Sequence, residues 1–218
     1  MELYLIRHAQ STNQTLEDRD NIVFDPRLTD LGERQAVLLA EYFAADKERV
    51  RFAESGIDRL TCSPMWRALQ TTRPLAEAFD LTPEVWVDVH EQVLTTELHP
   101  GTTREDIRTA FPGYRLPDEI TDRGWWQQGA EEVSEVMERA IRVAADLWRQ
   151  VPNDESLAIV SHVRFIDSLL KAFLNQLPGE DSWFHHGNTG VSRVGLSERG
   201  IEVRYINRLA HLPPHLTS

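Results

Sequence analysis

Residues 3–8 of the chain read LYLIRH, and residues 157–162 read LAIVSH. In both stretches four apolar residues run into a polar pair that contains a histidine. A short, continuous apolar run is typical of a strand that is buried on both faces of a sheet. Ligands of parallel α/β sheets bind beyond the carboxyl ends of such strands. The two stretches therefore predict two central strands whose histidines face each other across one crevice.

The rest of the chain alternates between strand and helix patterns. We predict further strands at 57–62 and 85–89, a hairpin from 191–196 and 201–206, and helices at 30–45, 63–79, 131–149 and 163–174. Such alternation predicts an α/β fold, a three-layer α/β/α sandwich with a mostly parallel central sheet. Residues 92–130 hold scattered proline and glycine, which indicates an insertion of loops and short helices over the strand ends. We expect residues 1–218 to form a single domain.

Three local details of the helices follow from residue types. Asp30 and Glu33 have the spacing of a capping box at the start of the first helix. Val37, Leu38, Tyr42 and Phe43 fit the period of that helix and are expected to face the core. Ser63 and Pro64 are expected to cap and begin the second helix.

The composition limits the partners of this protein. The chain has 35 acidic and 23 basic residues and a formal net charge of −12, so we expect neither nucleic acid nor a membrane surface as a partner. Cys62 is the only cysteine, which excludes an intrachain disulfide and a cysteine metal cluster. A reducing, cytoplasmic location is expected. Whether the chain forms a homo-oligomer stays open.

Basic residues gather at three predicted strand ends. Arg7 and His8 follow one strand, His162 follows another, and Arg67 lies near the start of a helix after a third. Helix N-termini attract anions, and arginine binds phosphate or carboxylate with two parallel hydrogen bonds. These positions predict a local anion pocket in an otherwise acidic protein.

Four stretches of the chain carry a family resemblance. They are residues 5–12 (LIRHAQST), 28–36 (LTDLGERQA), 62–72 (CSPMWRALQTT) and 159–162 (IVSH). In this order they resemble the histidine phosphatase superfamily, or phosphoglycerate mutase-like family, and its phosphatase branch in particular. The resemblance implies a phosphoglycerate mutase-like fold.

The resemblance also implies a covalent mechanism in two steps. His8 would attack phosphorus and form a phosphohistidine. Arg7, Arg67 and a protonated His162 would bind the phosphoryl oxygens and stabilise the charge of the transition state. Arginine and histidine supply the positive charge, so we expect no metal and no cofactor.

Two assignments stay open within the resemblance. The general acid follows the third strand, where Glu91 is preferred and Glu97 is the alternative. The family often carries a phosphate-binding asparagine six residues after the nucleophile. That position is Gln14 here, with Asn13 one place earlier, so either amide could bind substrate. Val163 stands where glycine is usual and narrows the floor of the pocket.

The leading hypothesis is a metal-independent phosphatase acting on small phosphorylated metabolites. Phosphoglycerate mutase-type transfer is the alternative, but residues 90–94 read HEQVL where the mutase branch has a different stretch. A non-catalytic phosphate-binding module on the same fold is the third reading. Substrate choice is expected to lie in the insertion. Its candidate contacts are Arg104, Arg108, Arg115 and Arg123, which could equally be surface residues.

Overall fold

The computed structural model describes residues 1–46, 56–95, 97, 99–126, 128–151, 155–176 and 182–218. Within them one six-stranded sheet has the order β3-β2-β4-β1-β5-β6. The strands are β1 (Glu2–Arg7), β2 (Arg59–Cys62), β3 (Glu84–Val85), β4 (Ser156–Ser161), β5 (Val191–Ser197) and β6 (Gly200–Arg208). The four strands β3, β2, β4 and β1 pair in parallel, and the predicted hairpin β5–β6 continues the sheet in antiparallel pairing.

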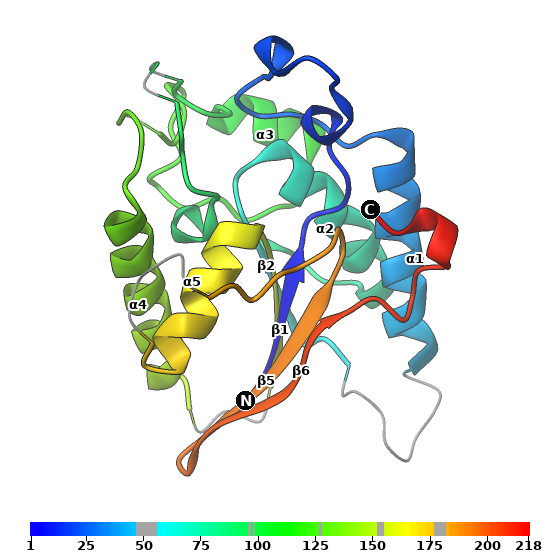
Figure 1. Cartoon of the computed structure of the whole chain (residues 1–218), viewed down its shortest axis with the longest axis vertical. Coiled ribbons are helices and arrows are strands. Elements are labelled where there is room, and N and C mark those ends of the chain that lie inside the picture. The colour runs from blue at the N-terminus through cyan, green and yellow to red at the C-terminus, as the bar shows by residue number, and fades with distance from the viewer. Residues whose placement is uncertain (47–55, 96, 98, 127, 152–154, 177–181) are drawn as a thin grey trace.

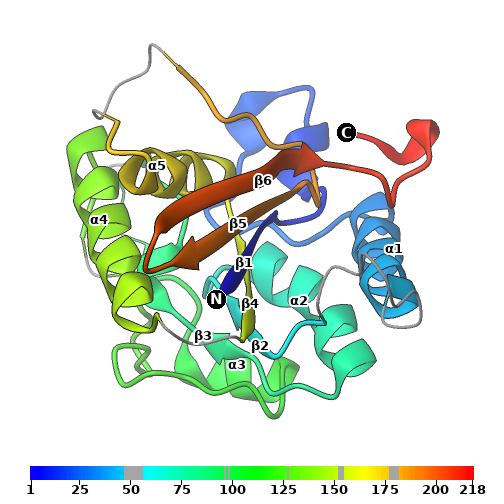
Figure 2. The same cartoon turned by 90° about the horizontal axis from the view of Figure 1, so that it is seen from below.

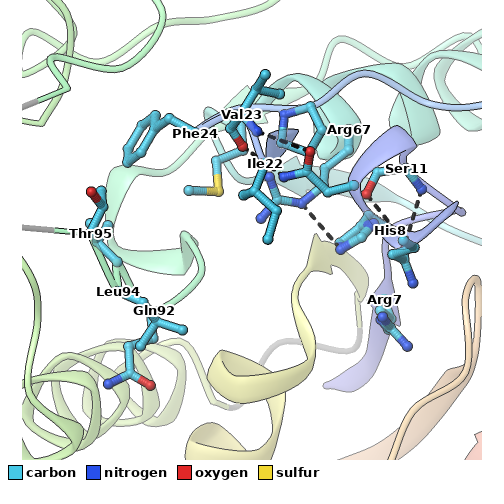
Figure 3. A pocket seen from close by; sticks show the side chains of 15 residues that line it. Arg7, His8, Ser11, Ile22, Val23, Phe24, Arg67, Gln92, Leu94 and Thr95 are labelled. Atoms are coloured by element: carbon cyan, nitrogen blue, oxygen red, sulfur yellow. Dashed lines mark hydrogen bonds between the residues drawn. The ribbon is translucent and has the colours of Figure 1, made fainter. Parts of the chain in front are cut away.

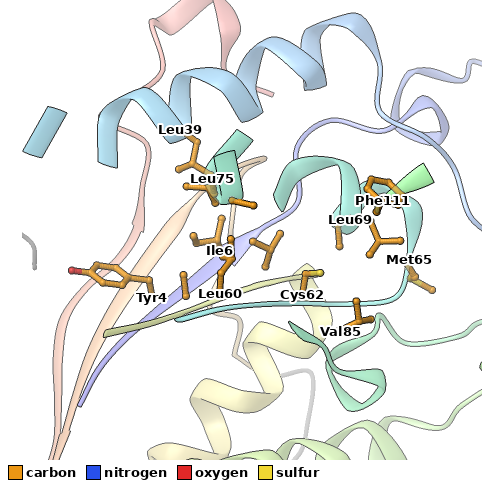
Figure 4. Close-up of a cluster of buried hydrophobic side chains, with 14 of the residues drawn as sticks. Tyr4, Ile6, Leu39, Leu60, Cys62, Met65, Leu69, Leu75, Val85 and Phe111 are labelled. Atoms are coloured by element: carbon orange, nitrogen blue, oxygen red, sulfur yellow. The ribbon is translucent and has the colours of Figure 1, made fainter. Parts of the chain in front are cut away.

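Helices cover both faces of this sheet, as Figures 1 and 2 show. The helices are α1 (Asp30–Asp46), α2 (Trp66–Phe79), α3 (Arg104–Ala110), α4 (Val133–Arg149) and α5 (Val163–Phe173). Side chains alternate along β1, so Tyr4 and Ile6 pack in the cluster with α1 and α2, while Leu3 and Leu5 pack with α4 and α5. Figure 4 shows the first cluster. The three-layer sandwich predicted from the sequence is confirmed.

The first helix buries a face that matches the prediction only in part. Phe43 is buried as predicted, Leu38 and Tyr42 are half-buried, and Val37 is 44% exposed, while Ala36 and Leu39 are buried instead. The helix packs against Ala9 and Leu28 through Ala36. Its cap also differs, because the Thr29 hydroxyl accepts the hydrogen bond from the backbone N–H of Gly32 at 3.0 Å.

The second helix begins later than predicted, at Trp66. The Asp25 carboxylate, 41 residues away in sequence, accepts the backbone N–H of Trp66 at 2.9 Å and so caps this helix from outside. The Ser63 hydroxyl accepts the N–H of Met65 at 3.2 Å. Ser63 thus stabilises the turn that leads from β2 into α2.

Two long segments lie over the carboxyl ends of the parallel strands. Residues 9–29 contain only short 3-10 turns, and the described part of residues 92–130 contains α3 (Figure 1). The predicted insertion therefore has the expected character and place. None of the described helices is long and apolar enough to cross a membrane.

Candidate active site

The order of the strands brings the predicted residues together. Because β4 lies between β2 and β1, the residues that follow these strands stand side by side. His162 Nε2 is 2.8 Å from the Ser63 hydroxyl, and the His162 and His8 rings are 5.0 Å apart. The crevice expected between the two strand-end histidines is present.

His8 is held as a neutral imidazole whose one lone pair, on Nε2, accepts a hydrogen bond. Its Nδ1 lies 2.7 Å from the carbonyl oxygen of Ala9, which can only accept, so Nδ1 carries the proton. Its Nε2 then accepts the Nε–H of Arg67 at 3.2 Å. Burial, and next the charges of Arg67 and Arg7, lower the pKa of His8 well below its usual value. The Nε2 lone pair therefore stays unprotonated near neutral pH, and it can react once it is released from the hydrogen bond with Arg67.

His162 differs from the expectation of a protonated imidazole. It is fully buried, and burial together with the nearby Arg67 and His8 lowers its pKa well below the usual value. The positive charge of this pocket therefore comes from the two arginines and not from His162. The Nδ1 atom of His162 is buried and has no hydrogen-bond partner in the protein.

Arg67 is buried and Arg7 is half-buried, and each has a buried nitrogen atom without a hydrogen-bond partner in the protein. Arg7 Nη1 donates to the carbonyl oxygen of His186 at 2.6 Å, while its Nε has no partner. Arg67 Nη1 lies 3.6 Å from Asp25 Oδ1 and makes no hydrogen bond. Burial is the main cause that lowers the pKa of both guanidinium groups, and the charge of Glu91 raises it. Both arginines nonetheless stay charged at neutral pH.

Glu91 lies beside these arginines, and Glu97 does not. The Glu91 side chain is half-buried, and its oxygens accept the backbone N–H groups of Gln92 at 3.0 Å and Arg164 at 3.5 Å. Glu97 is 82% exposed at its side chain and pairs with His99 at 3.5 Å. Of the two carboxylates left open by the sequence, Glu91 is the one whose charge acts on Arg7 and Arg67, although it is not among the residues that line the cavity.

A buried ion pair holds the segment that carries Glu91. Arg139 and Glu131 meet through two parallel hydrogen bonds of 3.0 and 2.8 Å. Arg139 Nη1 also donates to the carbonyl oxygens of Asp88 and His90, at 2.7 and 2.8 Å. Asp88 lies within a 3-10 turn over Val87–Val89, where the sequence predicted strand, and His90 directly follows that turn. In a longer strand these carbonyl oxygens would accept hydrogen bonds from a neighbouring strand, whereas here they accept them from Arg139.

The two amides left open by the sequence both line the pocket and are both engaged. Asn13 bonds the backbone of Val23 in both directions, at 2.7 and 3.2 Å. Gln14 exchanges hydrogen bonds with the Asn188 amide at 3.0 and 3.1 Å. Val163 is the first residue of α5 and is not among the residues that line the pocket.

A cavity of about 440 Å³ opens in front of His8, as Figure 3 shows. Its lining combines the cationic end with neutral and apolar side chains. The lining residues are Arg7, His8, Ser11, Asn13, Gln14, Ile22, Val23, Phe24, Pro26, Met65, Arg67, Gln92, Val93, Leu94 and Thr95. In the part of the chain that the structure describes, no group of three or more His, Cys, Asp or Glu side chains is arranged to hold a metal ion.

Sequence reasoning missed three residues that support this site. Asp25 pairs with Arg67, Arg139 holds the Glu91 segment, and the Asn188 amide donates to the carbonyl oxygen of His8 at 3.1 Å. Each of these residues lies far from its partner in sequence, so no local sequence pattern indicates its role. Thr71 could have been found, because it lies one helical turn after Arg67 and its hydroxyl accepts the N–H of Ala9 at 3.0 Å.

The family of the chain follows from a comparison with known families. The family model for the histidine phosphatase superfamily, branch 1, matches residues 3–209, nearly the whole chain. The chain belongs to this superfamily. The match includes both strand-end histidines and both pocket arginines, so the resemblance carried by the four sequence stretches is confirmed.

Individual relatives of this superfamily member are distant in sequence. A phosphoglycerate mutase-like protein of Arabidopsis thaliana is 23% identical over 211 residues, which cover 78% of this chain and 74% of the relative. A phosphoserine phosphatase variant of Entamoeba histolytica, solved with phosphoserine, has a TM-score of 0.66 and 20% identity, covering 97% of this chain and 99% of that chain. A mycobacterial glucosyl-3-phosphoglycerate phosphatase has a TM-score of 0.64 and 21% identity, covering 94% and 98%. At these identities the structures show a shared fold.

Proposed function

We propose that this protein is a metal-independent phosphatase that hydrolyses phosphomonoesters of small molecules through a phosphohistidine on His8. One observation carries the proposal. Three buried nitrogen atoms, Arg7 Nε, Arg67 Nη1 and His162 Nδ1, have no hydrogen-bond partner in the protein, and they belong to the residues grouped around His8. Unpartnered buried donors are costly. The oxygens of a phosphoryl group would accept hydrogen bonds from all three.

The proposed reaction uses His8 as the nucleophile and the protonated form of Glu91 as the acid. The lone pair of His8 Nε2 attacks phosphorus as the bond between phosphorus and the ester oxygen breaks. Glu91, as a carboxylic acid, gives its proton to the departing alcohol. Arg7 and Arg67 neutralise the charge that develops on the phosphoryl oxygens.

The second half of the cycle uses the same carboxyl group in its other state. The Glu91 carboxylate accepts a proton from a water molecule, whose oxygen attacks the phosphohistidine and releases phosphate. His8 Nε2 regains its lone pair, and Glu91 regains its proton. The hydrogen bond from His8 Nδ1 to the Ala9 carbonyl stabilises the positive charge that the ring carries in the phosphorylated state.

Membership of the superfamily supports this proposal, and so do the activities named for the two structural neighbours. The Arabidopsis relative is named after a mutase, so phosphoryl transfer is the result that would replace hydrolysis. The third reading, a binding module, predicts phosphate binding without turnover.

The test is phosphate release from a panel of phosphomonoesters in the presence of excess chelator. We expect chelator-resistant release that the His8→Asn variant loses by at least about 1,000-fold, because the nucleophile is removed. His215→Asn is the matched control, since His215 is exposed and is not among the residues that line the cavity. Quenching wild-type protein with alkaline detergent during turnover of ³²P-labelled substrate should trap a phosphoprotein that is stable in base and labile in acid. Equal rates for wild type and His8→Asn would refute the nucleophile. Isomerised ester in place of free phosphate would establish the mutase reading.

A further inference from the structure

The cavity in front of His8 has two ends of different chemistry. At the inner end stand Arg7, His8 and Arg67, which the proposed function assigns to the phosphoryl group. The outer end is bounded by Ile22, Val23 and Phe24 on one side and by Leu94 on the other (Figure 3). Any group attached to the phosphoryl oxygen has to leave the inner end between these walls.

The outer walls are apolar side chains that the protein leaves partly in water. Ile22 is 54% exposed, Val23 is 52% exposed and Leu94 is 67% exposed. Three large apolar residues around one opening are more than the scattered surface hydrophobics of an ordinary protein, and such patches mark binding sites.

The outer wall is also supported from behind. The Phe24 ring stacks on His99 with ring centroids 4.9 Å apart and an interplanar angle of 17°. Its other neighbour is Trp125, at 6.5 Å between centroids, and that indole is buried in the core. Asn13 bonds the backbone of Val23 in both directions. The wall is therefore a built surface in continuity with the core.

Among the residues that the structure describes, no charged side chain lines the outer end. The four arginines of the insertion, Arg104, Arg108, Arg115 and Arg123, are absent from the lining. Arg104 donates to the carbonyl oxygens of Ile120 and Pro117, and Arg115 pairs with Glu84 at 3.3 Å.

Arg164, the cation next to the lining residue Gln92, is also engaged. It donates to the Gln92 side chain at 3.1 Å and lies over the Trp183 ring. A substrate carboxylate at the outer end would meet apolar walls, and desolvation of an unpaired carboxylate is strongly unfavourable.

We infer that the substrate is the phosphate monoester of an apolar, uncharged alcohol, whose hydrocarbon part packs between Ile22, Val23 and Phe24 on one side and Leu94 on the other. This inference rests on the proposed function and names its substrate class. It sets the protein apart from a phosphatase of phosphoserine or phosphoglycerate, whose substrates carry a carboxylate close to the phosphate.

The test is a homologous series of n-alkyl phosphates from ethyl to octyl. All have nearly the same leaving group, so differences in kcat/KM report the binding of the chain. We expect kcat/KM to rise about 2- to 4-fold for each added methylene until the chain passes the walls. Phosphoserine and 3-phosphoglycerate should fall at least about 10-fold below butyl phosphate.

Three variants locate the effect. Ile22→Ser and Leu94→Ser should each flatten the rise of kcat/KM with chain length, because each removes part of the apolar wall against which the hydrocarbon packs. Ile141→Ser is the matched control. Ile141 is the same residue type with 53% exposure, on α4 and outside the cavity lining, so its series should equal that of the wild type.

Two results would overturn the inference while the proposed function stands. They are a flat series in the wild type, or a preference for phosphoserine or 3-phosphoglycerate over the alkyl esters. A slope that survives both wall substitutions would also overturn it, because the hydrocarbon then binds elsewhere. If no ester releases phosphate in a manner that depends on His8, the proposed function itself fails, and the inference fails with it.

Discussion

Substitution of Arg139, alone and together with Glu131, should distinguish the contribution of Arg139 to stability from its contribution to the placement of Glu91, the proposed acid. Arg139 and Glu131 are almost fully buried, with 4% and 6% of their side chains exposed. In Arg139→Met the Glu131 carboxylate would remain in the interior with no cation, and the carbonyl oxygens of Asp88 and His90 would each lose a donor. The free energy of unfolding should fall steeply.

The expected size of the loss follows from the geometry. Leaving one member of a buried ion pair uncompensated costs about 3–5 kcal/mol. For a domain of this length that loss corresponds to a fall in Tm of about 6–20 °C. Adding Glu131→Leu removes the orphaned charge as well, and well-packed apolar residues replace buried ion pairs at little cost. The double variant should therefore recover more than half of the lost stability.

Urea unfolding followed by tryptophan fluorescence would measure both variants, with the m-value as a check that the unfolded state is unchanged. The stable double variant then permits a second measurement. It still lacks the donor to Asp88 and His90, so Glu91 is held less firmly, and kcat should fall about 10- to 100-fold with little change in KM. A loss below about 1 kcal/mol in Arg139→Met, or no recovery in the double variant, would refute the account of this ion pair.

Three further outcomes are expected from features away from the reacting atoms. Burial lowers the pKa of His186 and of His211 to about 4, below the usual 6.5. Unfolding therefore takes up protons at a pH between these two values. The stability that comes from burying the two neutral rings is complete above pH 6.5 and is lost as the pH falls toward 4. Each should cost about 2 kcal/mol between pH 7 and pH 5, and unchanged urea midpoints at the two pH values would contradict this. Gly32→Ala should lower Tm, because a Cβ at this position overlaps the carbonyl oxygen of Gln10. The cost of this overpacking, about 1–3 kcal/mol, exceeds the gain in helix propensity from Gly to Ala. A raised Tm would show that the start of α1 and the segment at Gln10 move apart freely. Cys62 is buried with its pKa raised by burial to about 12, so a thiol reagent should label the protein only in denaturant, and rapid labelling of native protein would count against that burial.

The central part of the fold was predictable because β1 and β4 are buried on both faces. Their apolar runs carry no competing pattern, and the polar pairs that end them mark the functional edge. The buried face of α1 was not predictable in the same way. Apolar residues occur all around that helix, and the close approach of another segment of the same chain favours Ala36 over the larger Val37 at the buried position. Such a choice depends on the tertiary contact.

The same distinction between local pattern and tertiary contact applies to the residues of the candidate site. Residues that directly follow a strand or lie at a helix start, such as His8, Arg67 and His162, could be placed from sequence. Asp25 and Asn188 could not, because they reach the site through contacts between distant loops. The protonation of His162 was also out of reach, since it depends on burial and on the charges gathered around the ring.

The strand order has a consequence for how the protein is made. β1 has β4 on one side and β5 on the other, and its register pairs Glu2 with Ser156. The ribosome therefore releases the first strand long before either of its neighbours exists. Pairings between such distant residues form slowly, because a long loop has to close before any contact compensates the lost entropy. The crevice between His8 and His162 is completed only when this pairing forms, so nascent chains that end before β4 cannot turn over substrate.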